Sequence, residues 1–301
     1  MTSFLLKFVL KVCILMSIFN LNGNGLTAAY NIIGSYINSA YDLSGNNVFT
    51  IVPVPSGNLN ASEVIELPDI HNTGHGWTCT GLAYDIKSNT FLIGDIGKAT
   101  PSTPEFASQI IRVHPDFETI VEQIPLYTKF PNMSDIQGIA IDTSNDSIWF
   151  CSSGEGKVRN ITQSGTNRGV FDLSSASGIA YSSRDDSLWI LVTNTNEILK
   201  VSKSGTVKER YAFGYNETVD QCFLDESRGL LYITAGANYS ARNNIYCFNI
   251  NTHEQYIACI VDSYAVEGIW LGDTDKMIIL NDGYYHSAYV GENQVNIYTI
   301  E

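Results

Sequence analysis

The sequence predicts an all-β protein, specifically a β-propeller built from four-stranded blades. The first observation is an internal repeat that aligns without a gap at a spacing of 40 residues. The second is that the segments between polar turns are short and rich in β-branched and aromatic residues, as β-strands are. The third is that helical periodicity is almost absent after the N-terminal segment. Together they favour one repetitive all-β domain.

The repeat is clearest in the middle of the chain. Residues 138–141 (GIAI) match residues 178–181 (GIAY), and residues 146–149 (DSIW) match residues 186–189 (DSLW) in the same register. Looser copies begin at Gly81, Gln221 and Gly268. Five copies are therefore visible, and their length of 40 to 57 residues is typical of propeller blades rather than of sandwiches or helical solenoids.

Within one copy the sequence predicts short strands separated by polar turns. Residues 147–151, 157–161 and 169–173 are predicted strands, and residues 142–146 (DTSND) form a turn of residues that bond their own backbone or tolerate left-handed conformations. In a propeller, the first strand of each copy lies innermost, beside the central channel.

The number of blades depends on the two ends of the domain. Residues 47–55 and 63–67 are predicted outer strands, and residues 294–300 a third strand, so strands from both ends should share one blade. Residues 29–41 could contribute to a further blade. We therefore expect six blades in preference to five, in a single domain over residues 26–301.

The N-terminus has the layout of a signal peptide. Lys7 and Lys11 precede a short apolar run over residues 12–19, and Gly23 and Gly25 are small residues suited to cleavage after Gly25. The run is shorter than the roughly 20 apolar residues that cross a bilayer, although an uncleaved anchor is the alternative. No later segment is apolar enough to span a membrane, so we expect residues 1–25 to be removed and the domain to be secreted or periplasmic.

The charge of the chain limits its partners. The net charge is −14, and −16 once Lys7 and Lys11 are removed. Such a field repels phosphate backbones, which disfavours nucleic acid, and it favours divalent cations and basic or neutral ligands. The alternative interpretation is that the acidity only keeps an exported protein soluble.

The pattern of first and second strands resembles the six-bladed propellers of the NHL, gluconolactonase (SMP-30-like) and SdiA-regulated groups. The resemblance is at the level of the fold and covers nearly the whole domain. The gluconolactonase group holds a divalent metal with acidic and amide side chains around its channel. This implies a metal site at the positions of similar type and placement, which are Glu267, Asp220, Asp282 and Asn194. The ligands of that group do not match here in their order along the chain.

In such folds, the loops that enter each innermost strand and the loops that leave each second strand lie at one end of the channel. This end carries oxygen and imidazole groups, and oxygen-rich rings suit calcium. His71, His75 and Trp77 suit stacking on a sugar or another ring. The alternatives are acids that cap turns and aromatic residues that pack between blades. The candidate ligand-binding residues are His71, His75, Trp77, Asp95, Tyr284 and His286.

Five cysteines remain after the signal segment, and Cys247 and Cys259 flank a predicted hairpin turn near His253. We expect them to lie directly opposite each other, as a disulfide or as two buried thiols. The chain has no nucleophile elbow of the form Gly-x-Ser-x-Gly and no phosphate-binding loop.

Three functions remain open from the sequence. The first is a secreted propeller that recognises a small molecule, a carbohydrate or a protein at the channel, with or without calcium. The second is a metal-dependent hydrolase of the lactonase or esterase type. The third is a scaffold without a small-molecule site, because a fold does not determine a function.

Overall fold

The computed structural model describes strands at residues 37–41 and 47–51 and then residues 54–70, 78–97, 108–133, 135–235, 242–272, 275–282 and 293–300. The chain divides into two units, Met1–Pro53 and Val54–Glu301. In the first unit, β1 (Ile37–Tyr41) and β2 (Asn47–Ile51) form an antiparallel pair. The predicted signal segment and His71, His75, Trp77, Tyr284 and His286 lie outside the described residues.

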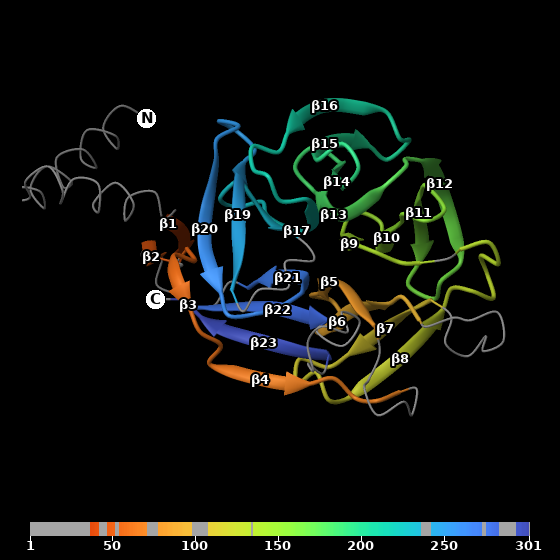
Figure 1. Cartoon of the computed structure of the whole chain (residues 1–301), viewed down its shortest axis with the longest axis horizontal. Helices are drawn as coiled ribbons and strands as arrows, with labels where there is room; N and C mark the ends of the chain where they lie inside the picture. The colour runs from red at the N-terminus through yellow and green to blue at the C-terminus, as the bar shows by residue number, and fades with distance from the viewer. Residues whose placement is uncertain are drawn as a thin grey trace, which may run out of the picture. The chain divides into compact units, whose positions relative to one another are not determined.

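The second unit is a β-propeller of four-stranded blades, as predicted (Figure 1). From the innermost strand outward, the first blade consists of β5 (Cys79–Asp85), β6 (Thr90–Asp95), β7 (Gln109–Val113) and β8 (Ile120–Pro125). The second blade consists of β9 (Ile139–Asp142), β10 (Ser147–Ser152), β11 (Lys157–Thr162) and β12 (Asn167–Asp172). The third blade consists of β13 (Ala176–Ser182), β14 (Ser187–Val192), β15 (Glu197–Ser202) and β16 (Val207–Ala212). The fourth blade consists of β17 (Val219–Asp225), β18 (Leu230–Ala235), β19 (Asn243–Asn249) and β20 (Gln255–Val261), and β3 (Gly57–Leu59) is added at its outer edge as a fifth strand. The fifth blade consists of β21 (Val266–Leu271), β22 (Lys276–Asp282), β23 (Asn293–Thr299) and β4 (Glu63–Glu66).

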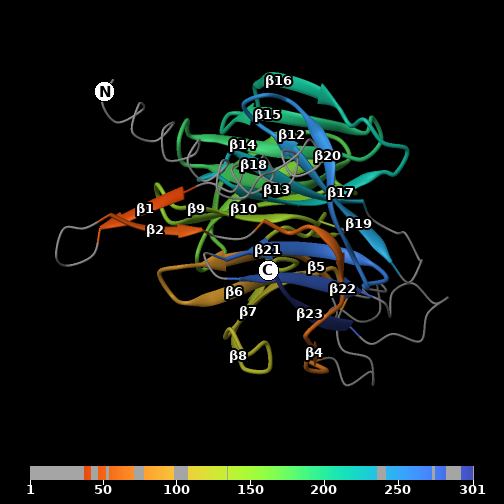
Figure 2. The ribbon, with the colours of Figure 1, turned by 90° about the vertical axis from the view of Figure 1, so that its left-hand side faces the viewer.

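The innermost strands β5, β9, β13, β17 and β21 contact one another in turn, and β21 returns to β5 to close the ring. The outermost strands β16 and β4 lie at opposite rims in both views (Figures 1 and 2). Within the described residues the ring has five blades, so the preference for six was wrong. The strands available for a sixth are used elsewhere, because β1 pairs with β2, while β3 and β4 add to the fourth and fifth blades.

The fifth blade combines strands from distant parts of the chain. β23 pairs antiparallel with β4, with Val295 opposite Ile65. β3 adds to the fourth blade in parallel to β20, with Ile260 opposite Asn58. The edges of these two blades are thus covered by strands that precede the first blade.

The sequence repeat corresponds to a structural repeat. Trp149 lies opposite Ala140 in the second blade, and Trp189 lies opposite Ala180 in the third, so the two tryptophans occupy equivalent positions. Both are buried between blades, where large side chains fill the space between neighbouring sheets.

The repeated glycines allow the innermost strands to approach closely at the centre of the ring. A Cβ atom on Gly138 would lie 2.5 Å from the backbone oxygen of Ser177, and one on Gly178 would lie 2.5 Å from that of Asp220. Glycine is required at such positions because no side chain fits between the two backbones. Gly81, Gly178 and Gly268 lie inside their strands, whereas Gly138 immediately precedes β9.

The predicted register of Cys247 and Cys259 was wrong. Cys247 lies opposite Tyr256, because the hairpin turn is centred between residues 251 and 252 rather than near His253. Cys259 lies opposite Ile245, beyond a β-bulge between Ile245 and Tyr246 that shifts the register by one more residue. Both cysteines are buried free thiols. In the part of the chain that the structure describes, no helix has the length and apolar character needed to cross a membrane.

Candidate functional site

The end of the channel where the innermost strands begin carries a pair of carboxyl groups. Asp220 lies near the start of β17 and Glu267 near the start of the neighbouring β21, and their side chains are hydrogen-bonded. Ser177, from β13, donates its hydroxyl to Oδ1 of Asp220 at 2.6 Å. Three consecutive blades therefore contribute to one polar group beside the channel.

The pKa values of both carboxyl groups are raised. Burial raises the pKa of Glu267 from 4.5 to about 7, and the hydrogen bond from Asp220 offsets only part of this effect. Burial and then the negative charge of Glu267 raise the pKa of Asp220 well above its ordinary value. In the hydrogen bond between them Asp220 is the donor and Glu267 the acceptor, as expected for two carboxyl groups that share one proton in a buried site.

A second group of acids lies around the thiol of Cys79, at the start of β5. Burial raises the pKa of this thiol, and so do the negative charges of Asp282, Glu267 and Asp95. Asp95 accepts hydrogen bonds from Nε2 of Gln109 and from the backbone amide of Gly97, both at 3.0 Å. Asp282 and Asp95 end the second strands β22 and β6, so the acids meet where the fold brings those strand ends together.

Gln221 extends across the channel next to the carboxyl pair. It occupies the position of the repeated glycine in the fourth blade, and its side chain is buried. Its Nε2 atom lies 3.4 Å from Oγ1 of Thr80 and 3.4 Å from Oγ of Ser177, so it links β17 with β5 and β13. The residue before this position of the repeat is polar, as in Thr80, Ser177 and Asp220, and the residues after it are apolar.

The structure brings together some of the predicted metal-site residues and not others. Asp220 and Glu267 are in contact, whereas Asn194 is exposed in the turn after β14. Asn196 is the residue of this turn that faces the neighbouring loop, where it bonds the backbone of Glu217 and Val219. Among the described residues, no group of three or more His, Cys, Asp and Glu side chains has the geometry of a metal site.

One acid at this end of the channel has the turn-capping role that the sequence left open. Asp135 accepts hydrogen bonds from Ser152, Ser153 and the backbone amide of Gly154 at 2.8 to 3.1 Å. These bonds hold the loop that leaves β10. They satisfy the carboxylate within the loop itself.

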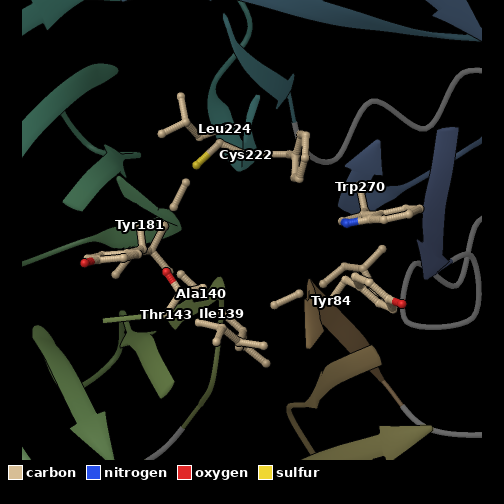
Figure 3. Close-up of a pocket in the computed structure, with 14 residues that line it drawn as sticks. Tyr84, Ile139, Ala140, Thr143, Tyr181, Cys222, Leu224 and Trp270 are labelled. Carbon is tan, nitrogen blue, oxygen red and sulfur yellow. The ribbon is translucent and has the colours of Figure 1, made fainter. Parts of the chain in front are cut away.

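The opposite end of the channel holds a cavity of about 220 Å³, which we call the apolar cup (Figure 3). This site was not predicted from the sequence. Its signal is the second residue after the repeated glycine, which is alanine in three blades and Phe223 or Trp270 in the other two. The residues that line the cup are Leu82, Ala83, Tyr84, Ile139, Ala140, Ile141, Thr143, Ile179, Ala180, Tyr181, Cys222, Phe223, Leu224 and Trp270.

Comparison with known proteins supports the fold alone. No protein-family model matches the chain, and no curated protein matches its sequence. The structure of Myxococcus xanthus glutaminyl cyclase is similar, with a TM-score of 0.54 and 10% identity over 83% of this chain and 100% of that one. In a nidogen/laminin complex, one chain is similar with a TM-score of 0.50 and 15% identity over 78% of this chain and 96% of that one. The chain spans 62% of the RRP9 WD40-repeat structure, at a TM-score of 0.45 and 13% identity over 76% of this chain. The neighbours thus include an enzyme and a protein-binding complex, and the NHL-like grouping has no support from a family model.

Proposed function

We propose that this chain is an exported recognition propeller that binds a cationic ligand at the acidic end of its channel. The observation that carries the proposal is the hydrogen-bonded pair of half-buried Asp220 and buried Glu267, placed on neighbouring innermost strands. Asp95 and Asp282 add negative charge close to Glu267, since all three act on the thiol of Cys79. The net charge of −14 also attracts cations to the chain as a whole.

The carboxyl pair would bind a cation by exchanging a proton for it. A protonated amine or a metal ion beside Glu267 would favour the ionised forms of both acids, so Asp220 would release its proton. Affinity should therefore increase as the pH rises through about 7, the pKa of Glu267. Calcium is one candidate cation, but it takes six to eight oxygen ligands, and the described acids alone do not supply them.

Thermal melting tests this proposal with calcium chloride and with n-butylammonium chloride as the two probes, against EDTA and sodium chloride. At about a hundred times the dissociation constant, a bound cation should raise the melting temperature by about 5 °C. Glu267→Gln combined with Asp282→Asn should abolish the increase. Asn194→Ala is the matched control, because this side chain is exposed, and it should keep the full increase. No response to either probe in the unaltered protein would refute the proposal.

A hydrolase of the lactonase type is the second candidate, because a carboxyl group with a pKa of about 7 suits a general base at neutral pH. Glu267 would accept a proton from water while Asp220 holds it in place. The described residues do not form the metal site that such an enzyme requires, so we derive no step through a metal. Hydrolysis of γ-butyrolactone by purified protein, lost in Glu267→Gln, would favour the enzyme over the recognition propeller.

A further inference from the structure

The apolar cup is a separate candidate site, at the end of the channel opposite the carboxyl pair. Its lining comes from the ends of the innermost strands, as in Tyr84 on β5, Tyr181 on β13 and Trp270 on β21. The carboxyl pair lies near the starts of these strands, and Gln221 crosses the channel in between. The cup is therefore independent of the proposed cation site.

The cup has the size of a site for one aromatic ring. An apolar cavity of about 150 Å³ holds a benzene molecule, and this cup measures about 220 Å³. Figure 3 shows Trp270 and Tyr84 on one side of the cup, Tyr181 on the opposite side, and Cys222 and Leu224 between them. Trp270 is held against Tyr84 and Phe91, with ring centroids 5.2 and 5.1 Å apart, so this aromatic wall is packed in place.

The charges around the cup favour a neutral ligand. None of the lining residues is charged. The nearby carboxylates at the ends of β5 and β9 are each paired, Asp85 with Arg112 at 3.0 Å and Asp142 with Lys203 at 2.9 Å. The cup therefore lacks the carboxylate that would favour an organic cation among its aromatic rings.

The polar side-chain groups of the lining are the hydroxyls of Tyr84, Thr143 and Tyr181, the thiol of Cys222 and the indole N–H of Trp270. The hydroxyls of Tyr84 and Tyr181 donate to Asn89 and Asp186 at 2.7 and 2.9 Å, which directs them away from the centre. The indole nitrogen of Trp270, in contrast, lies on the side of its ring that faces the centre of the cup (Figure 3). Within the described part of the chain, no hydrogen bond is found for this N–H group.

From this arrangement we infer that the apolar cup binds a small neutral molecule with one aromatic ring and one hydrogen-bond acceptor, which accepts from the Trp270 indole. The aromatic ring of the ligand would contact Tyr181 and Trp270 and fill the space that the small alanine side chains of the lining leave open. The acceptor oxygen sets its orientation, since a hydrogen-bond donor in a largely apolar site discriminates against analogues that lack the acceptor.

The test compares two probes of matched size, acetophenone and ethylbenzene, which differ in the carbonyl acceptor. Saturation-transfer NMR and calorimetric titration should show both binding to the unaltered protein, with acetophenone favoured by about 3- to 10-fold. Trp270→Phe keeps a ring but removes the N–H group, so it should abolish this preference while ethylbenzene still binds. Trp149→Phe, the same substitution outside the cup, should keep the preference.

A second variant tests the location without removing any wall of the cup. Ala140→Leu adds three carbon atoms at the lining and should weaken both probes by about tenfold or more through loss of volume. Its melting curve shows whether the variant is folded. Failure of both probes to bind the unaltered protein, or equal binding of the probes to a folded Ala140→Leu variant, would overturn the inference.

Discussion

Replacing Glu267 by glutamine should stabilise the protein by about 3 kcal/mol at pH 8 and leave it nearly unchanged at pH 4.5. The pKa of Glu267 is raised by burial from 4.5 to about 7. Between these values the folded state holds a proton that the unfolded state has lost, so the free energy of unfolding falls as the pH rises. Above pH 7 the full cost of a buried charge is present, and glutamine removes it while it still bonds Asp220.

Urea denaturation at a series of pH values measures this difference. Glu226→Gln provides a control of opposite sign. Burial raises the pKa of Glu226, but hydrogen bonds from Ser182, Ser183 and the backbone of Arg184 outweigh this effect and hold the pKa below its ordinary value. Glu226→Gln should therefore lower stability at pH 8. If Glu267→Gln and the unaltered protein gave parallel profiles from pH 4.5 to 8, the carboxyl pair would not titrate as described.

The blades could be predicted from the sequence because the constraint that forms them repeats. Four of the five innermost strands have a glycine where they meet the next strand, with Gln221 in the remaining one, and this repeat places Gly138 and Gly178 in register with Trp149 and Trp189. The number of blades follows no such local rule. It depends on whether short strands such as β1 and β4 pair with each other or with an existing blade, which the sequence of each strand does not encode.

The site shows the same division. The resemblance to the gluconolactonase group implied Asp220 and Glu267, as residues of similar type and placement, and the structure brings them together. Asn194 was predicted on the same grounds but is exposed, because the direction of a side chain in a tight turn changes from one residue to the next. The apolar cup was missed because its lining consists of consecutive residues on buried strands, and such short apolar runs are also typical of an ordinary core.

Replacing Gly178 by alanine should lower the free energy of unfolding by about 3 kcal/mol, an effect as large as that of Glu267→Gln but of opposite sign. The added Cβ atom would lie 2.5 Å from the backbone oxygen of Asp220 and 2.9 Å from the backbone nitrogen of Cys222. These atoms belong to β17, which cannot move aside without breaking its pairing with β18. The substitution therefore forces apart two innermost strands of the ring.

Gly169→Ala is the matched control, since a Cβ atom there has no neighbour within 4 Å, and its unfolding curve should match that of the unaltered protein. Gly178→Ala also links the fold to the site, because the displaced strand carries Asp220, the partner of Glu267. In a folded Gly178→Ala variant, the hydrogen bond between the two acids should weaken, and NMR titration of the Glu267 carboxyl carbon should show a changed pKa. A variant with unaltered stability and an unaltered Glu267 titration would show that the innermost strands are not in the contact that the repeated glycines provide.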